Sequence, residues 1–289
     1  MTEVKRGFKR KTIEQMLRGK VNHWLKSITD EDLRKRVKDH YIVTGGAIVS
    51  MLLGDMPNDY DIYLDNAVVA ADLSKYYVKK ILGDDAAGVE VKVSENNDRV
   101  EIKVSSSGYL SYKDAADDSE NKGKYKVKTI TTNAITLSDK VQIVLRFVGK
   151  AKEIHKNYDF VHATNYFTER KGLVLHQKAL ESIMARELKY VGSLYPVCSV
   201  FRIKKFLNRG WTITAGETLK ILFDVSKLDL SNLEVLSDQL TGVDTTFFTT
   251  MLDRLKQRDE AVDRSYLFEL INEIFDGEDP SEEDEEENN

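Results

Sequence analysis

The stretch from Tyr41 to Asp65 reads YIVTGGAIVSMLLGDMPNDYDIYLD and decides the fold. It opens on an apolar, β-branched run, Tyr41–Val43, of the kind found in buried strands. Gly45-Gly46 ends this run where a helix has to start, so backbone N–H groups there can face an anion without intervening side chains. Turn residues follow, and residues 59–63 then alternate with a period of two. The stretch therefore predicts a strand, a glycine turn, a short helix, a loop and a second strand.

Asp59 and Asp61 stand one residue apart on the second predicted strand, which places both carboxylates on the same face. Two adjacent carboxylates are costly to keep ionised without a partner. Mg²⁺ takes carboxylate oxygens and keeps coordination positions for water and substrate phosphates. A phosphate cradle followed by an acidic pair therefore indicates metal-assisted phosphoryl or nucleotidyl transfer.

This segment resembles the signature of the nucleotidyltransferase superfamily, which includes DNA polymerase beta and the tRNA CCA-adding enzymes. That signature is a hydrophobic residue, Gly-Gly or Gly-Ser, a short spacer, and Asp-x-Asp or Asp-x-Glu. Here residues 44–46 (Thr-Gly-Gly) precede a spacer of twelve residues and then residues 59–61 (Asp-Tyr-Asp). The resemblance covers only residues 41–65. Val49-Ser50 stands where CCA-adding enzymes have an Arg-Asp pair, which argues against CCA addition.

The resemblance implies an α+β fold, with a nucleotidyltransferase-type mixed β-sheet and flanking helices, followed by an all-helical domain and an acidic tail. It implies transfer of a nucleoside monophosphate from a nucleoside triphosphate to a hydroxyl acceptor, with release of pyrophosphate. Two Mg²⁺ ions, or Mn²⁺ in their place, would be held by Asp59, Asp61 and a third acid. Gly45 and Gly46 would bind the phosphates, with Ser50 one helical turn further on as a hydrogen-bond donor.

Asp159 is the first candidate for the third acid. It lies in the sequence Tyr-Asp-Phe (residues 158–160), which resembles an acid-bearing dipeptide that opens a strand in several viral nucleotidyltransferases. Residues 156–167 are expected to form that strand, and an acid inside an aromatic, β-rich run is costly to bury without a partner. Glu101, on the second strand of a predicted hairpin, is the alternative. His155 and His162 are interpreted as structural histidines.

A basic run near residue 205 is the candidate for a further anion contact. Arg202, Lys205 and Arg209 are spaced so that they lie near one face of a helix. The run resembles an Arg-x-x-Lys-aromatic-x-x-Arg-Gly-aromatic pattern of some viral and minimal nucleotidyltransferases. Such a face would bind the triphosphate or a primer strand, and exposed, solvated charges are the alternative interpretation.

Composition limits the class of protein. A hydrophobic content of 41% supports a real core, and no apolar run is long enough for a membrane span or a signal peptide. The single cysteine, Cys198, excludes an internal disulfide and predicts a reducing, cytoplasmic compartment. Residues 276–289 carry nine acids and no base, and removing them changes the formal charge from −5 to +4. A mildly basic body suits an anionic substrate but not a strong nucleic-acid binder.

Four regions are expected along the chain: basic helices at 1–40, the catalytic domain at 41–171, a helical domain at 172–275, and a disordered acidic tail at 276–289. The tail would solubilise the protein or contact a protein partner. Helices are expected over 12–25, 30–40, 68–82, 173–191 and 196–207. The basic residues near the first helix would either contact a nucleic-acid backbone or form a solvated face: Lys9, Arg10, Lys11, Arg18 and Lys20.

The acceptor remains open between an RNA 3′ end, a protein hydroxyl and a small molecule, and the same core also allows a synthase of cyclic or linear signalling oligonucleotides. An RNA 3′ end suits the basic helices best. The alternative class is a catalytically inactive binding or structural protein that keeps the same fold and acts on a host or virion partner. The tyrosine-rich strands and residues 133–147 resemble uncharacterised nucleotidyltransferase-like proteins of bacteriophages, which implies a viral origin and the host cytoplasm. A nuclease is less favoured, because it would not need the glycine turn.

Overall fold

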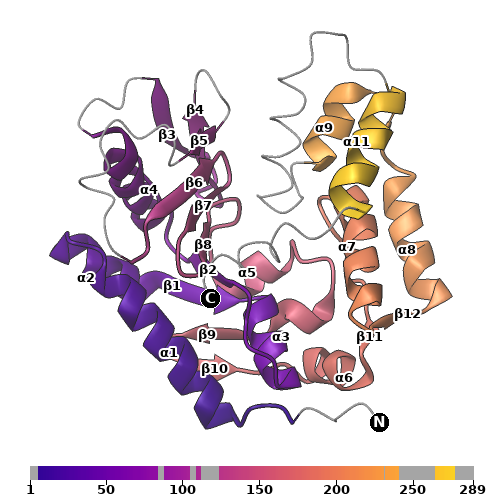
Figure 1. Cartoon of the computed structure of the whole chain (residues 1–289), viewed down its shortest axis with the longest axis horizontal. Coiled ribbons are helices and arrows are strands. Elements are labelled where there is room, and N and C mark those ends of the chain that lie inside the picture. Colours follow the sequence, from indigo (N-terminus) through magenta and orange to yellow (C-terminus); the bar gives the residue numbers. More distant parts are fainter. Residues whose placement is uncertain are drawn as a thin grey trace. The chain divides into compact units, whose positions relative to one another are not determined.

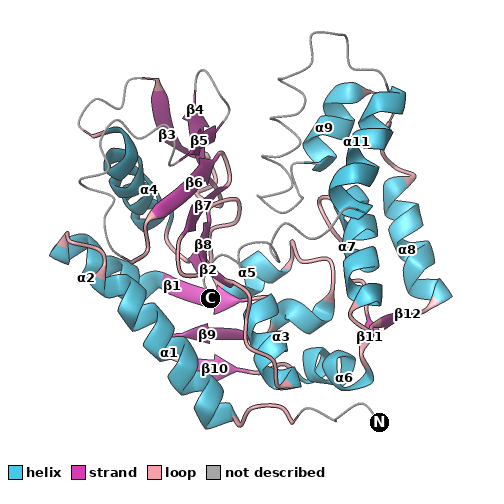
Figure 2. Ribbon diagram, in the orientation of Figure 1, coloured by secondary structure: helices cyan, strands magenta, loops and turns pink. Residues whose placement is uncertain are grey.

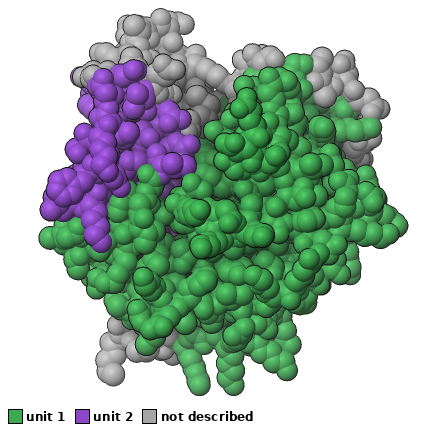
Figure 3. All heavy atoms as spheres, turned by 180° about the vertical axis from the view of Figure 1, so that it is seen from behind, with its two compact units in different colours: residues 1–193, 211–218 green, residues 194–210, 219–289 purple. Residues whose placement is uncertain are grey.

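A computed structural model of the chain describes residues 6–83, 88–104, 109–111, 124–230, 232–240 and 264–276. Its helices and strands are mixed, as Figures 1 and 2 show, and the α+β class expected from the sequence is confirmed. The chain divides into two compact units, coloured separately in Figure 3: residues 1–193 with 211–218, and residues 194–210 with 219–289. The expected acidic tail lies outside the described residues except for Asp276.

The first unit contains the sheets and most of the described helices. Its helices are α1 (Arg10–Lys26), α2 (Glu31–His40), α3 (Gly46–Leu53), α4 (Ala67–Leu82), α5 (Ala151–His155), the 3₁₀ helix η2 (Val161–Thr164) and α6 (Gln177–Ala185). The strands of its large sheet are β1 (Tyr41–Thr44), β2 (Tyr60–Leu64), β5 (Tyr109–Ser111), β6 (Val127–Thr131), β7 (Ala134–Leu137), β8 (Val141–Val144), β9 (Tyr166–Thr168) and β10 (Gly172–Val174). Two small sheets pair β3 (Val89–Val93) with β4 (Val100–Val104) and β11 (Glu187–Leu188) with β12 (Thr212–Ile213).

The large sheet has the strand order β10-β9-β1-β2-β8-β7-β6-β5. β1 and β2 are antiparallel, with Val43 opposite Ile62. β2 and β8 are parallel, with Asp61 beside Gln142. The remaining described pairs of this sheet are antiparallel. The strand that carries the acidic pair is therefore central, between β1 and a strand about eighty residues further along the chain.

The two faces of the sheet differ in chemistry. One face carries side chains such as Val43, Ile62 and Ile143, and packs into one core with α1, α2 and α4 (Figure 1). Alternation places the next residues of each strand on the opposite face. That opposite face carries Ile42 and Tyr63, which pack against α5 in a second, smaller cluster. We call it the site face, because Asp61 lies on it.

Helix α1 is held to the sheet by apolar and polar contacts. Its helical period buries one stripe, Ile13, Leu17, Val21, Trp24 and Leu25. Trp24 is fully buried, and its indole N–H donates to the hydroxyl of buried Tyr77 on α4 at 2.9 Å. A buried indole needs such an acceptor, because an unpaired N–H loses its hydrogen bond to water.

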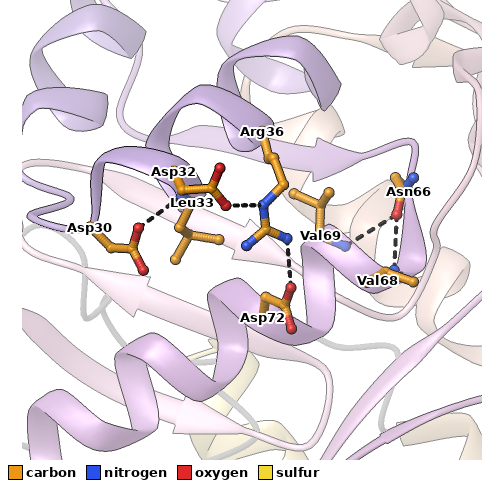
Figure 4. A network of polar contacts seen from close by, with 8 residues as sticks. All are labelled: Asp30, Asp32, Leu33, Arg36, Asn66, Val68, Val69 and Asp72. Atoms are coloured by element: carbon orange, nitrogen blue, oxygen red, sulfur yellow. Dashed lines mark hydrogen bonds and ion pairs between the residues drawn. The ribbon is translucent and has the colours of Figure 1, made fainter.

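Two caps fix the starts of α2 and α4 (Figure 4). Asp30 accepts a hydrogen bond from the N–H of Leu33, and Asn66 accepts from Val68 and Val69. Arg36 of α2 then links the two helices. It donates to Asp32 at 2.9 Å and to Asp72 of α4 at 2.6 Å.

The basic residues near the first helix contact the protein itself. Arg10 donates to the carbonyl of Leu173 at 2.6 Å. Arg18 pairs with Glu169 at 2.9 Å. Lys20 donates to the carbonyl of Asp139 and lies over the rings of Tyr60 and Tyr125. Three of the five residues considered for a nucleic-acid contact thus have roles within the fold.

The second unit is helical over its described residues. It contains α7 (Pro196–Asn208), α9 (Leu233–Leu240), α11 (Arg264–Asp276) and most of α8 (Ala215–Val225). Cys198 of α7 is buried, and its thiol donates to the carbonyl of Gln239 on α9 at 2.8 Å. None of the helices within the described ranges is long and apolar enough to cross a membrane.

Helices expected over 12–25, 30–40, 68–82 and 196–207 are confirmed as α1, α2, α4 and α7. The long helix expected over 173–191 is wrong. Residue 172 begins β10, and α6 ends at Arg186, whose φ of 48° is left-handed and stops the helix. Strands β10, β11 and β12 therefore lie beyond residue 171, where only helices were expected.

Removing the Asn66 cap should destabilise the first unit. Asn66→Ala leaves two N–H groups of α4 without their acceptor, and we expect a loss of about 1 kcal/mol in the free energy of unfolding. Urea unfolding followed by circular dichroism measures it. Asn66→Asp, which keeps the acceptor, should unfold like the wild type, and an equal loss in both variants would contradict the cap.

Tyr77→Phe should destabilise the protein more than the same change at the adjacent Tyr76. It leaves the buried Trp24 N–H unpaired, at an expected cost of about 1–3 kcal/mol. The Tyr76 hydroxyl instead contacts the exposed Thr29 N–H at 3.1 Å, where water can replace it. Thermal unfolding of both variants measures the difference, and similar midpoints would contradict the importance of the buried pair.

Candidate active site

The turn between β1 and α3 presents a helix N-terminus to the acidic strand. Gly45 caps α3 with a φ of 96° and a ψ of −147°, and no side chain caps the helix. The Gly45 N–H donates to the carbonyl of Ala163 at 3.2 Å, while Gly46 is exposed. A helix N-terminus has N–H groups without intrahelical partners and a partial positive charge, which together suit an anion.

Gly45 also approaches the acidic pair closely. A Cβ atom at this position would lie 3.2 Å from Oδ2 of Asp61 and 3.8 Å from the hydroxyl oxygen of Tyr158. Both the positive φ and the lack of space require glycine here. The expected juxtaposition of the glycine turn and Asp61 is therefore present in the structure.

The acidic pair sits at the start of β2. Asp59 immediately precedes the strand and is exposed, while Asp61 is its second residue and is half-buried. Alternation puts the two carboxylates on the same side. Continuing the β1–β2 register by one residue brings Thr44 opposite Asp61, and Gln142 of β8 lies on its other side.

Thr44 connects the turn to a buried histidine. Its hydroxyl lies 2.8 Å from Nε2 of His155 and donates to the carbonyl of Asn165 at 2.9 Å. Burial, assisted by the neighbouring His176, lowers the pKa of His155 to about 4, so its imidazole is neutral at neutral pH. His155 was expected to be structural, and its place is directly behind the glycine turn.

An aromatic wall borders Asp61 on the α5 side. The ring of Tyr158 lies 6.2 Å from that of Tyr63 and 5.1 Å from that of His155. Tyr166 continues the wall at 5.8 Å from both His155 and His176. Burial, together with the charge of nearby Asp61, raises the pKa of the Tyr158 hydroxyl well above its usual value. This hydroxyl therefore keeps its proton beside the carboxylate.

The strand expected over residues 156–167 is wrong. The segment forms a turn, an isolated bridge between Phe160 and Tyr190, and the 3₁₀ helix η2 before β9 begins at Tyr166. Asp159 lies in the turn, where its carboxylate accepts from the N–H of Phe160 at 3.0 Å. Nearby His162 is buried, with its ring 4.5 Å from that of Trp211, and burial lowers its pKa to about 4.

The other third-acid candidate, Glu101, lies on β4 in a small sheet separate from β2. It pairs with Arg99 at 3.1 Å and with Lys103 at 3.9 Å. Over the described ranges, no group of three or more His, Cys, Asp or Glu side chains is placed to hold a metal ion. The identity of a third acid thus stays a prediction.

The remaining predicted site residues are Ser50, Arg202, Lys205 and Arg209. Ser50 is half-buried on α3, one turn after the helix N-terminus. Arg202 and Lys205 lie on α7 and Arg209 caps that helix, all within the second unit. Their role in nucleotide binding stays a prediction. Thr44, Tyr158 and Gln142 carry no local sequence signal for the site, because strand register and the packing around α5 bring them near Asp61.

Solved structures of CCA-adding enzymes are similar to this chain, with low sequence identity and low TM-scores. A CCA-adding enzyme in complex with ATP matches at 14% identity with a TM-score of 0.41, over 94% of this chain and 66% of that one. The Thermotoga maritima CCA-adding enzyme in complex with tRNA matches at 14% identity with a TM-score of 0.38, over 70% and 44%. Likeness at this level carries no argument about activity.

A sequence relative is the protein Gabija anti-defense 2 of Bacillus phage SPbetaL7, 26% identical over 132 residues. The match covers 43% of this chain and 33% of the relative, so it spans about a third of that protein's length. The model of the family described as Gabija anti-defense 2 family protein matches residues 15–186, more than half of the chain, including the glycine turn and the acidic pair. The chain therefore belongs to the Gabija anti-defense 2 family.

Proposed function

We propose that this protein is a metal-dependent nucleotidyltransferase that moves a nucleoside monophosphate from a nucleoside triphosphate to a hydroxyl acceptor and releases pyrophosphate. One observation carries the proposal: the uncapped N-terminus of α3 and the Asp61 carboxylate meet at Gly45, where a Cβ would lie 3.2 Å from Oδ2. A site for phosphates and a site for a cation thus share one location. That combination supports phosphoryl chemistry more than either half alone.

The donor set fits a hard divalent cation. Asp59 and Asp61 offer carboxylate oxygens on one face, and the glycine leaves space beside Oδ2 of Asp61. Mg²⁺ is commonly held by one or two carboxylates together with substrate phosphates, and Mn²⁺ accepts the same ligands. Two ions are proposed during turnover, with Asp159 or Glu101 as candidate third acid. When bound, the metal neutralises charge on the transferring phosphoryl group.

The chain's own groups then have separate tasks. The N–H groups at the start of α3 would bind the triphosphate, with Ser50 as a further donor. Nε2 of neutral His155 lies 2.8 Å from the Thr44 hydroxyl oxygen. This contact would position Thr44 and the adjoining glycine turn without adding a charge. The Tyr158 hydroxyl keeps its proton and adds no charge beside Asp61.

The acceptor is proposed to be a hydroxyl of a host component, with an RNA 3′ end as the first candidate. Arg10, Arg18 and Lys20 have contacts within the fold. The basic run of Arg202, Lys205 and Arg209 at α7 is the second proposed contact for RNA, on the basis of its spacing. The phage relative is named Gabija anti-defense 2. We infer that the transfer reaction helps a phage to overcome the host defence to which this name refers, in the host cytoplasm.

A catalytically inactive binding protein is the second candidate. The pairing of Glu101 with Arg99 and Lys103, and the lack of a three-ligand cluster over the described ranges, favour it. Such a protein would act on a host or virion partner by docking, with the acidic residues 276–289 as one candidate contact. Calorimetry with Mg²⁺ and each triphosphate separates the two, because a docking protein should release no metal-dependent heat of nucleotide binding.

Asp61→Asn should abolish transfer. The variant keeps the size of the side chain but removes one of the two charges that hold the metal. We expect the rate to fall at least about 100-fold, the order seen when one group that stabilises transition-state charge is removed. Transfer of label from a radioactive triphosphate to total host RNA, or to the protein itself, measures it. Asp39→Asn removes an exposed acid of α2 and should leave the rate unchanged. Equal rates in all three proteins would refute the assignment.

Gly45→Ala should weaken triphosphate binding and lower stability together. The φ of 96° is unfavourable for alanine, and the new methyl group would press on the Asp61 carboxylate. We expect a loss of about 1–3 kcal/mol in unfolding free energy. Urea unfolding and calorimetric titration with ATP and Mg²⁺ measure the two effects. Gly19→Ala, in the interior of α1 where a Cβ meets no atom within 4 Å, should be neutral or stabilising and should bind normally. Normal ATP affinity in Gly45→Ala would contradict the proposed phosphate site.

A further inference from the structure

Tyr166 on β9 lies in the same row of side chains as the start of the glycine turn. β1 and β9 are neighbours in the sheet (Figure 1), and their register pairs Thr44 with Tyr166. Side chains of paired residues on neighbouring strands leave the sheet on the same side. The Tyr166 ring therefore stands on the site face, one strand or about 5 Å away from the residue that precedes Gly45.

His176 forms the outer end of the aromatic wall. The residue is exposed, and its ring centroid lies 5.8 Å from that of Tyr166 at an interplanar angle of 35°. His176 is the N-cap residue of α6, but its side chain does not cap the helix. Its imidazole makes no hydrogen bond to any residue that the structure describes. The ring is thus held by packing, against Tyr166 and, edge-on at 6.3 Å, against His155.

Lys171 adds a positive charge at the same place. Its Nζ lies 5.9 Å from the centre of the Tyr166 ring. Glu169 and Arg170, which precede it in the turn between β9 and β10, each have an ion-pair partner. Across the described part of the chain, no carboxylate pairs with the Lys171 ammonium. Its charge therefore remains available to a ligand that lies against the Tyr166 ring.

The inner and outer parts of the wall differ in what they do for the fold. Tyr63 belongs to the small apolar cluster with Ile42 and Ile154, so core packing accounts for its ring. His176 is exposed and caps nothing, so the fold itself does not require an aromatic ring there. An exposed aromatic ring, backed by a second ring and next to a cation, is a surface on which a nucleobase stacks, because every base has a π-face.

The distance between the aromatic rings and the acidic pair suits one nucleotide. β9, β1 and β2 are successive strands of the sheet, and neighbouring strands lie about 4.8 Å apart, which puts Tyr166 roughly 10 Å from Asp61. A nucleoside triphosphate carries its base on one side of the ribose and its phosphates on the other. With the phosphates at the N-terminus of α3, the base reaches the rings of Tyr166 and His176.

We infer that His176 and Tyr166 form a stacking site for the base of the bound nucleoside triphosphate, with the Lys171 ammonium beside the rings. The inference rests on the proposed function for the position of the triphosphate. It adds three residues from β9, the β9–β10 turn and the start of α6. Stacking on aromatic side chains tolerates every base, so this contact contributes affinity for the nucleotide and little choice between bases.

Calorimetric titration of the full-length protein in Mg²⁺ tests the inference with two probes, ATP and inorganic tripolyphosphate, which has no base. His176→Ala should weaken ATP binding by roughly 5- to 100-fold, the range for the loss of one base–aromatic contact. The same variant should bind tripolyphosphate like the wild type. His176→Phe keeps an aromatic ring and should keep the wild-type affinity for ATP.

His23→Ala is the matched control. His23 is an exposed histidine of α1 whose ring also packs against a tyrosine, with its centroid 5.4 Å from that of Tyr125. This variant should bind both probes normally. Ultraviolet irradiation with 8-azidoadenosine triphosphate gives a second readout, because the label should attach within residues 166–176 and be displaced by ATP.

Unchanged ATP binding in His176→Ala, an equal loss of both probes, or a photolabel found only elsewhere in the chain would each overturn the inference. The labelled-transfer assay separates this failure from failure of the proposed function. Transfer by the wild type, together with normal ATP binding in His176→Ala, would leave the function standing and remove the inference. Weakened ATP binding in that variant, without transfer by the wild type, would do the reverse. A wild type that binds no ATP would remove both.

Discussion

The close approach of the β1–α3 turn to β2 is the constraint on which the rest of the site depends. It places the positive end of α3 and the carboxylate of Asp61 against the same glycine. A helix N-terminus stabilises one anion well. A triphosphate bound at this N-terminus would be repelled by the Asp61 carboxylate. At an effective dielectric constant near 20, two unit charges about 4 Å apart interact by roughly 4 kcal/mol. A divalent ion between them turns this repulsion into attraction, so the geometry itself favours a metal-dependent ligand.

Two groups close to Asp61 and the glycine turn are held uncharged by burial. Burial leaves His155 neutral, and it leaves the Tyr158 hydroxyl protonated, because in each case the low-dielectric setting disfavours the charged form. Both groups therefore act through hydrogen bonds and packing. A positively charged histidine beside Thr44 would compete with a cation for the field of Asp61.

The local part of this arrangement can be predicted from sequence and the long-range part cannot. Three local signals in residues 41–65 predicted β1, α3 and β2: the apolar run, the double glycine and the alternating segment. Each of these signals acts over only a few residues. Asp159 was misplaced because its segment looks like a strand, while a bridge from Phe160 to Tyr190 and the helix η2 give it another conformation. Gln142 has no local signal. Its place beside Asp61 comes from the parallel pairing of β8 with β2, across about eighty intervening residues.

Energetic cost separates the two candidate functions better than family membership does, since an anti-defence protein can work by chemistry or by docking. Gly45 is held at a φ that other residues adopt only with strain. Asp61 is a half-buried carboxylate whose in-register neighbours are an amide and a hydroxyl. Partial burial of a carboxylate carries a desolvation cost, which a ligand that binds the folded protein offsets. A protein that acts only by docking needs neither feature, because its contacts would lie on its surface. The cost is offset where a cation and a phosphate group bind, and that is the reading the geometry of this site favours.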